Sequence, residues 1–347
     1  MLRSFPPAAA EDNNWLNDAL IGMLMLIHEH VRRGETPPDW PAIIPAEHRA
    51  RLSPRTALKR ELQDYVSALR GLTDAEELRA WEVIKLQNNI AALVAGTCEC
   101  ADVTALPAAV REPLAAIFET SFRYLSDFEI RDRHYASIYN SGVRICPFCG
   151  CEPFDAPGAA REDYDHYLVR SIYPAAAANL RNLVPIGNKC NTRYKRSVDI
   201  LRANGVRRRA FDPYSGATVV VSLRTSDLFD DSRIGPSVPR WRVEFSPDIE
   251  ETTTWSTIFR IRERFVRDHL DPEYLGWVRL FQDWCRRSSI QAGAEPAEVL
   301  RAYTDFMAIE NRDQPRGFLR TAVFDMLLRH CEADNQRLKE LVKSWYQ

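Results

Sequence analysis

Side chains that could carry out hydrolytic chemistry gather within 50 residues near the middle of the chain. This stretch contains a Cys-x-x-Cys pair, an Asp-His pair, an Asn-Leu-Val-Pro segment and a Cys-Asn-x-x-x-Lys segment. In order along the chain, its chemically distinctive residues are Cys146, Cys149, Cys151, Asp165, His166, Asn182, Cys190, Asn191 and Lys195.

These residue types match the needs of phosphodiester hydrolysis. That reaction requires a base to activate water, a divalent cation near the scissile phosphate, and a rigid frame that fixes both. A histidine can serve as the base, and carboxylate and amide oxygens are the ligands that hard divalent cations prefer.

The elements that must position these residues are two strands and a helix. The run Tyr164 to Val169 is typical of a short strand. Because neighbours on a regular strand point to opposite faces, Asp165 and His166 can serve one site only if the hairpin is distorted. Leu180 to Ile186 is the expected second strand. The segment Lys189 to Leu201 is expected to be a helix whose first turn carries Asn191.

The motifs of this stretch resemble those of an HNH endonuclease domain of the ββα-metal type. The similar proteins carry Cys-Pro-x-Cys-Gly, Asp-His-Tyr-Leu-Pro-Lys-Ser, Asn-Leu-Val-Pro and Cys-x-x-Cys-Asn in this order. The resemblance implies that His166 is the general base, that Asp165 and Asn191 bind Mg²⁺ or Mn²⁺, and that Asn182 bridges the loop that orients the histidine. Lys195 takes the place of a basic residue that commonly follows.

The resemblance also implies partners. Proteins of this type are similar to bacterial antiviral defence effectors that act with an ATPase or sensor protein. One such centre cuts one strand, so a double-strand break calls for two chains, for example in a homo-oligomer, or for two visits.

Two positions depart from the family pattern. The usual proline of the Asp-His-Tyr-Leu run is Val169 here, and Gly187 stands where a second cysteine pair would begin. Three of four structural zinc ligands therefore remain, namely Cys146, Cys149 and Cys190. Because a closed zinc site needs four ligands, Cys151 is one candidate for the fourth. The alternative is a knuckle that has lost its metal and keeps small buried cysteines.

The individual site residues also have structural interpretations. The chain has seven histidines, but only His166 lies beside a carboxylate within the ordered motifs. Asn182 could turn the backbone, and Asn191 could cap free amides at the start of a helix. Their spacing from the Asp-His pair favours the functional interpretation.

Charge is distributed unevenly. The net charge of the 347 residues is only -2, yet nine basic residues face a single acid, Asp199, between residues 181 and 210. This excess is expected to contact a phosphate backbone, with a solvated helix face as the alternative. The residues expected to bind nucleic acid are Arg193, Lys195, Arg196, Arg207, Arg208 and Arg209.

Cysteine usage and hydropathy bear on the compartment. Eight cysteines are too sparse for a disulfide scaffold, and the longest apolar run, Ala19 to Ile27, is too short to span a bilayer. The segment before that run is acidic rather than basic, unlike a signal peptide. A cytoplasmic protein that makes no membrane contact is expected.

The expected fold is mainly α with a small α+β insert. Helical regions at residues 1–140 and 251–347 would flank the HNH module at 141–210 and a small β element and loop at 211–250. Helices are expected at 15–31, from 53, from a capping box at Thr73 and Glu76, at about 108–137, and in several segments after 255.

Competing functions remain open at this stage. A non-catalytic zinc-knuckle protein would bind nucleic acid without metal-dependent cleavage. A nuclease with clustered carboxylates completed by Glu-x-Lys is disfavoured because the sequence contains no Glu-x-Lys. The helical regions could also form an interaction scaffold that controls the nuclease.

Overall fold

The computed structural model describes residues 4–159, 164–229, 238–310 and 314–346. These residues are mainly helical, with small strands that form three two-stranded antiparallel sheets. The expectation of a mainly α protein is confirmed. The chain divides into two compact units, which are described separately. The N-terminal unit comprises Ser4–Val143 and Phe154–Ala217, and the C-terminal unit includes Arg144–Pro153 and the residues from Thr218 onward.

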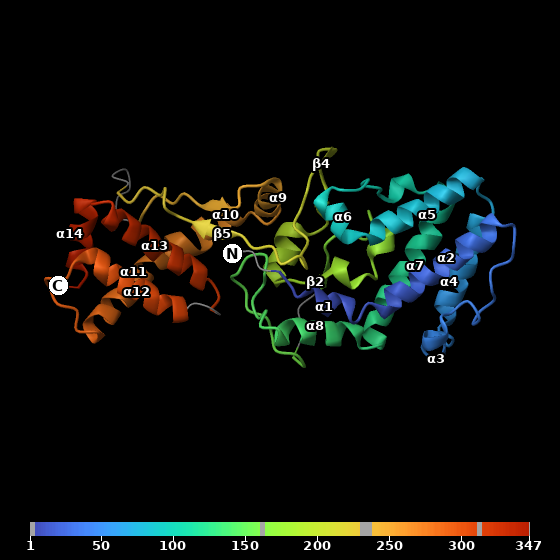
Figure 1. Cartoon of the computed structure of the whole chain (residues 1–347), viewed down its shortest axis with the longest axis horizontal. Coiled ribbons are helices and arrows are strands. Elements are labelled where there is room, and N and C mark those ends of the chain that lie inside the picture. Colours follow the sequence, from blue (N-terminus) through green and yellow to red (C-terminus); the bar gives the residue numbers. More distant parts are fainter. Residues whose placement is uncertain (1–3, 160–163, 230–237, 311–313, 347) are drawn as a thin grey trace. The chain divides into compact units, whose positions relative to one another are not determined.

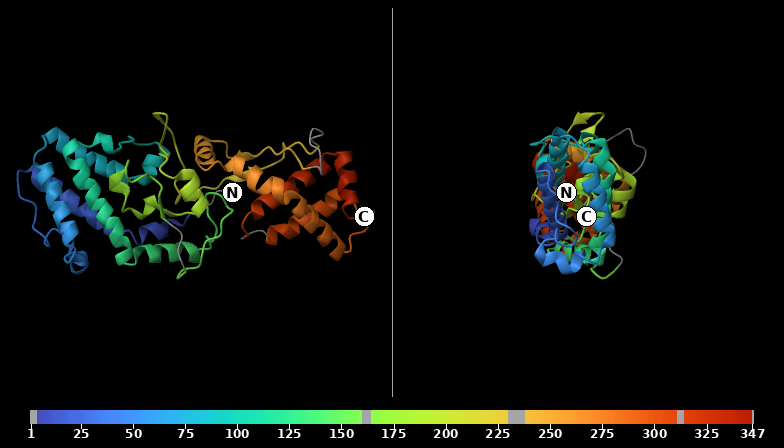
Figure 2. Two further views of the ribbon diagram at one scale, coloured as in Figure 1. Left: turned by 180° about the vertical axis from the view of Figure 1, so that it is seen from behind. Right: turned by 90° about the vertical axis from the view of Figure 1, so that its right-hand side faces the viewer.

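Helices make up most of the N-terminal unit. Helix α4 packs along α7, and α2 contacts both α5 and α7, as the two opposite views show (Figures 1 and 2). The helices of this unit are α1 (Pro7–Glu11), α2 (Trp15–Arg32), α3 (Arg49–Leu52), α4 (Thr56–Leu69), α5 (Asp74–Asn88), α6 (Ile90–Ala95), α7 (Ala108–Asp127) and α8 (Ile130–Asn140).

Local sequence signals account for α4 and α5. The apolar residues of α4 recur at helical spacing, and Leu58, Leu62 and Tyr65 are buried. The predicted capping box is confirmed, because Glu76 N donates to Thr73 Oγ1 at 3.4 Å and Thr73 N donates to Glu76 Oε2 at 2.9 Å. These bonds satisfy two free backbone amides at the start of α5.

The expectation of one helical stretch from 108 to 137 is wrong in one respect. Helix α7 ends at Asp127 and α8 begins at Ile130, because Glu129 adopts a left-handed conformation with φ of 57°. A residue in this conformation cannot continue a right-handed helix. Helix α8 therefore takes a new direction from α7 (Figure 1).

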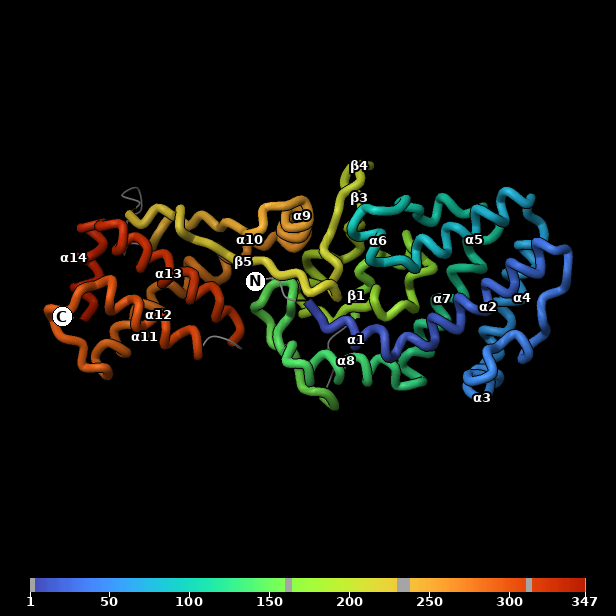
Figure 3. The backbone as a smooth tube through the Cα atoms, viewed as in Figure 1, coloured from blue at the N-terminus to red at the C-terminus, as the bar shows by residue number. Residues whose placement is uncertain are grey.

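Two hairpins complete the N-terminal unit. Strand β1 (Tyr164–His166) pairs with β2 (Leu183–Pro185). Strand β3 (Arg202–Ala203) pairs with β4 (Val206–Arg207) through a turn at Asn204 and Gly205. The second hairpin projects from the body of the unit beside α6 (Figure 3). Both residues of its turn have positive φ, as a tight two-residue hairpin requires.

The C-terminal unit joins a small hairpin to a set of helices. Strands β5 (Val220–Ser222) and β6 (Glu244–Ser246) form a β element within the region 211–250, where the sequence predicts one. The helices are α9 (Glu250–Ile258), α10 (Ile261–Arg264), the π-helix η6 (Phe265–Leu270), α11 (Asp271–Arg287), α12 (Pro296–Glu310), α13 (Gly317–Glu332) and α14 (Gln336–Ser344). Helix α12 packs along α13.

Aromatic side chains form the core of this unit. The ring of Phe281 lies 5.0 Å from that of Tyr303 and 5.6 Å from that of Phe324. The sequence predicts one helix from about residue 318 to residue 345, but this segment is broken into α13 and α14, because Asp334 adopts a φ of 62°. Among the described residues of the whole chain, no helix has both the length and the apolar character needed to cross a membrane.

Candidate active site

The frame of the site is a hairpin with very short strands. His166 of β1 lies opposite Leu183 of β2, and Asp165 lies opposite Val184. Each strand is only three residues long, shorter than the sequence predicts, because the chain bends after His166 and residues Leu180–Asn182 form a 3-10 turn before β2. The long loop between the strands must therefore be held by side chains.

Helix α5 anchors this loop. Gln87 Oε1 accepts a hydrogen bond from Ala175 N at 2.9 Å, and Asn88 Nδ2 donates to Ala175 O at 2.8 Å. Asn179 Nδ2 donates to Asn88 O at 3.3 Å. The loop also packs on α7 through the 3-10 turn Pro174–Ala176. Its backbone is thus bound to the helical body rather than exposed to solvent.

Asn182 joins the two ends of the loop. Leu168 N donates to Asn182 Oδ1 at 2.6 Å, while Asn182 Nδ2 donates to Leu168 O at 3.0 Å and to Ala176 O at 3.1 Å. The side chain is fully buried. Because both ends of its amide are used by the loop, Asn182 acts on backbone groups next to His166 and offers nothing to a cation.

His166 is held by its Nε2 atom. This atom lies 3.1 Å from the carbonyl oxygen of Ala177, and a carbonyl oxygen only accepts, so Nε2 carries the proton. The imidazole packs against Phe122 of α7 at a centroid distance of 4.6 Å. Nδ1 has no hydrogen-bond partner within the described part of the chain and is therefore the basic nitrogen.

The surroundings of His166 keep it neutral. Burial, followed by the positive charge of Arg170, lowers the pKa of His166 to about 4. The imidazole is therefore unprotonated at neutral pH, as a proton acceptor must be.

Asp165 is buried and lies against a buried lysine. Its Oδ2 atom is 2.8 Å from Lys195 Nζ, at an angle outside that of a hydrogen bond. The same ammonium donates to His166 O at 2.8 Å, and Lys195 is fully buried. Burial raises the pKa of Asp165 to about 6, although the Lys195 charge opposes this rise.

Asn191 and Lys195 share one short helix. The π-helix η5 (Cys190–Lys195) has the wide hydrogen bond from Arg196 N to Asn191 O, 2.8 Å long. Asn191 is half-buried, four residues before Lys195. The predicted helix from 189 to 201 is wrong in length: the helical turn ends at Lys195, because Arg196 adopts a φ of 49°.

Three of the six predicted nucleic-acid contacts point inward. Lys195 has no exposed surface. Arg207 donates to the carbonyl oxygens of Leu93 and Leu201, and Arg208 donates to those of Asp199 and Ile200. These three side chains support the fold and leave the predicted nucleic-acid surface. The side chains of Arg193, Arg196 and Arg209 are exposed.

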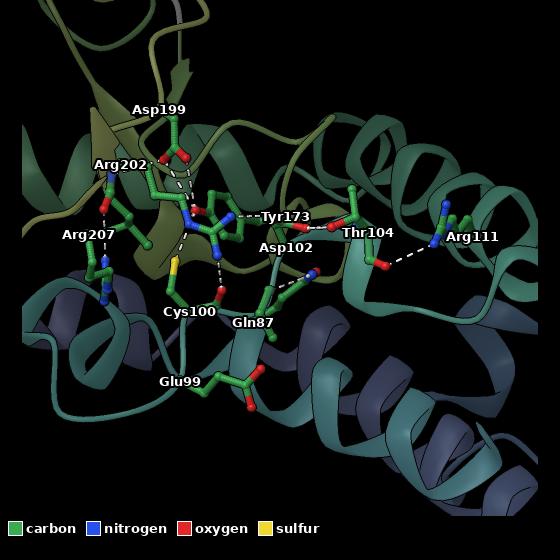
Figure 4. Close-up of polar contacts among 12 residues, drawn as sticks. Gln87, Glu99, Cys100, Asp102, Thr104, Arg111, Tyr173, Asp199, Arg202 and Arg207 are labelled. Atoms are coloured by element: carbon green, nitrogen blue, oxygen red, sulfur yellow. Dashed lines mark hydrogen bonds and ion pairs between the residues drawn. The ribbon is translucent and has the colours of Figure 1, made fainter. Parts of the chain in front are cut away.

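A polar network takes up other charges of the basic stretch (Figure 4). Arg202 pairs with Asp102 and donates to the carbonyl oxygen of Cys100 at 2.7 Å. Tyr173 OH donates to Asp199 at 3.2 Å and contacts Cys100 Sγ at 3.3 Å. Asp199 Oδ1 also accepts from Leu201 N. The network holds residues 199–202 against the connection between α6 and α7. The sequence predicts instead that the helix from Lys189 continues to Leu201.

Three cysteines form a group that could hold a metal ion. These are Cys146, Cys149 and Cys190, and all three residues are buried. Cys151 does not join them, because its thiol donates to the carbonyl oxygen of Cys149 at 3.2 Å. Instead, its backbone N–H donates to Cys149 Sγ at 3.4 Å.

The turn that carries Cys146 and Cys149 is fixed within the C-terminal unit. Trp255 Nε1 donates to Phe148 O at 2.9 Å, and Arg316 N donates to Gly150 O at 2.9 Å. Gly150 has a φ of 66°, and a Cβ atom there would lie 2.6 Å from the ring of Phe318. Only glycine fits this position without displacing the phenylalanine.

A second histidine supports the hairpin, and the sequence did not indicate it. His134 of α8 is fully buried, with Nδ1 2.9 Å from Tyr164 OH and Nε2 3.0 Å from Tyr214 OH. Tyr214 OH donates to Leu183 O at 2.7 Å. Sequence reasoning also missed Lys195 as the partner of Asp165 and Phe122 as the support of His166. No local pattern reveals these contacts, since each joins residues far apart in the chain.

Comparison with known proteins does not assign the chain. No model of a known protein family matches it, and neither a curated protein nor a solved structure shows significant similarity.

Proposed function

We propose that residues 164–195 form the centre of a metal-dependent endonuclease of the HNH type, which hydrolyses phosphodiester bonds of DNA. The observation that carries the proposal is the state of His166. One ring nitrogen is fixed by the Ala177 carbonyl, the other is available as a base, and a buried carboxylate, Asp165, is the adjacent residue.

The protein's own groups account for the proton transfer. His166 Nδ1 accepts a proton from water as the water oxygen bonds to phosphorus and the bond from phosphorus to the 3′ oxygen breaks. The departing oxygen takes its proton from solvent, and the products carry 5′-phosphate ends. Asn182 and Phe122 keep the imidazole from turning during this step, because one holds the loop and the other packs on the ring.

The donor set suits a hard divalent cation. Asp165 supplies a carboxylate oxygen that accepts no hydrogen bond, and Asn191 supplies an amide oxygen. Oxygen ligands of this kind are those that Mg²⁺ and Mn²⁺ prefer. When bound to these two residues, the cation supplies positive charge for the scissile phosphate and the leaving oxygen.

Exposed arginines provide a route for the nucleic acid. Arg193 and Arg196 project from η5 or directly follow it, and Arg170 is exposed four residues after His166. Arginine binds phosphate through a planar fork of donors. An ATPase or sensor partner, and a role in antiviral defence, rest on the family resemblance alone. Co-purification from the native host tests them.

The cysteine group is proposed as a structural zinc site. Three thiolates would bind the ion, and the N–H of Cys151 would stabilise one of them through its hydrogen bond to Cys149 Sγ. Metal analysis of the purified protein, with Cys149→Ser as the comparison, tests this assignment. Stoichiometric zinc in the wild type and its loss in the variant are expected.

The test of the nuclease is cleavage of supercoiled plasmid with added Mg²⁺ or Mn²⁺. Nicking that requires the cation is expected, and His166→Ala should slow it by about 10²- to 10⁴-fold, the usual contribution of a general base. His48→Ala, at a half-buried position in the same unit, is the matched control and should cleave normally. Undiminished cleavage by His166→Ala would refute the mechanism.

A non-catalytic nucleic-acid-binding protein is the second candidate. The observation that favours it is the ion pair of Asp165 with Lys195, because the lysine already neutralises the charge of the carboxylate. On this alternative, Arg193 and Arg196 bind DNA, but no added cation produces nicks.

A further inference from the structure

The ammonium of Lys195 occupies the position expected for a cation. It lies 2.8 Å from Asp165 Oδ2 and 2.8 Å from the carbonyl oxygen of His166. Both atoms are oxygens of the two residues on which the proposed hydrolysis depends. The lysine has no exposed surface, so these contacts are not those of a mobile surface side chain.

The lysine comes from the same helix as the second proposed cation ligand. Lys195 follows Asn191 by four residues in η5, and the helical turn ends immediately afterwards at Arg196. A π-helix has slightly more than four residues per turn, so residues four apart lie close to one face. The helix that offers Asn191 to a cation thus also delivers an internal competitor for Asp165.

Charge makes the two occupants mutually exclusive. A divalent ion on Asp165 would stand within a few ångströms of the ammonium, in a buried site where water screens their repulsion poorly. Asp165 carries one negative charge and cannot neutralise both. Binding of the metal therefore requires the Lys195 side chain to leave its present position.

We propose that Lys195 is a built-in competitor of the catalytic cation, which holds Asp165 in a metal-free state and lowers the affinity of the site for Mg²⁺ or Mn²⁺. This inference rests on the proposed function, since it takes Asp165 as a cation ligand. A purely structural ion pair would instead predict that removing the lysine harms folding and leaves metal affinity unimproved.

The experiment is calorimetric titration of the full chain with Mn²⁺ in the absence of nucleic acid. Lys195→Met keeps a long side chain and removes the charge, and it should bind Mn²⁺ at least tenfold more tightly than the wild type. Lys195→Arg retains the charge and should show no such gain. Asp165→Asn should remove the binding in both the wild-type and the Lys195→Met background.

Thermal melting covers the case in which Lys195→Met folds poorly. The variant leaves a buried carboxylate without its partner, so Mn²⁺ should raise its melting temperature more than that of the wild type. The double variant Asp165→Asn/Lys195→Met has no buried charge at this position and should be insensitive to Mn²⁺. A folded Lys195→Met variant with unchanged Mn²⁺ affinity, or a destabilised one that Mn²⁺ does not rescue, would overturn the competition.

Failure of this inference is distinguishable from failure of the proposed function. If plasmid is nicked but Lys195→Met gains no affinity, the competition alone is refuted. If Lys195→Met gains affinity but no plasmid is nicked, the endonuclease is refuted and the competition of lysine and metal for Asp165 stands.

Discussion

His134, which is fully buried, and His166, which is half-buried, belong to one unit and differ in how many ring nitrogens the protein uses. Both nitrogens of His134 are bound, one by Tyr164 OH and one by Tyr214 OH. His166 is bound only through Nε2. The difference teaches that hydrogen bonding separates the two roles: an imidazole with both nitrogens bound connects elements, whereas one with a single bound nitrogen can still accept a proton.

The largest effect that separates the two is on stability. His134→Ala should lower the free energy of unfolding by about 3 kcal/mol, because it opens a cavity and removes a hydrogen bond from each of two buried hydroxyl groups. His166→Ala should cost about 1 kcal/mol, since it loses one hydrogen bond and a ring contact. Urea unfolding measures both values, and equal losses would contradict the distinction.

Acid should act through His134 next. Burial lowers the pKa of His134 to about 3, against an ordinary value of 6.5, so the unfolded chain binds more protons between these limits. The stability contributed by the neutral imidazole is complete above pH 6.5 and is lost as the pH falls towards 3. Roughly 2 kcal/mol should disappear between pH 6.5 and 5.

The variant His134→Gln isolates this contribution. Glutamine keeps hydrogen-bonding groups but does not titrate. The slope of the unfolding free energy against pH should therefore fall in this range by the equivalent of up to about one bound proton. His166 has a pKa shifted in the same direction and would retain its own share. A variant whose slope equals that of the wild type would show that His134 does not titrate as stated.

The smallest effect concerns Arg193 of η5 and Arg196, which directly follows this helix. The double variant Arg193→Gln/Arg196→Gln should weaken DNA binding several-fold. The slope of log affinity against log salt concentration should fall by the equivalent of up to about two phosphate contacts. Arg207→Gln is the matched control, because its guanidinium donates to backbone carbonyls of the fold. It should lower the melting temperature and leave DNA affinity unchanged. Fluorescence anisotropy at two salt concentrations decides between them.

The sequence predicts the helical frame of the protein well where local signals are strong. The stripe of α4 and the capping box at Thr73 and Glu76 lie within single turns of helix, and both occur as expected. The strands at Tyr164 and Leu183 and the hairpin at Val220 are also found near their predicted places. Breaks at Glu129 and Asp334 escaped prediction, because nothing in their composition forces a left-handed residue.

The candidate site was harder to predict than its frame. Residue type and order suffice to name Asp165, His166 and Asn182, but the side chains that complete their environment come from distant segments. Phe122 and Ala177 reach His166 from a helix and a loop, and Lys195 is the buried last residue of η5. The sequence shows the charge excess from 181 to 210. It does not show that Arg207 and Arg208 donate hydrogen bonds to backbone carbonyl oxygens.

Asn182 should protect backbone amides of the loop after His166 from hydrogen exchange. Tyr167 N donates to Asn182 O and Leu168 N to Asn182 Oδ1, so two consecutive amides outside any strand are closed off from water. Hydrogen–deuterium exchange at these amides would require the whole hairpin to open rather than the loop to fray. We therefore expect the segment to exchange its amides as an extension of β1 does, and Asn182 holds the backbone that directly follows His166.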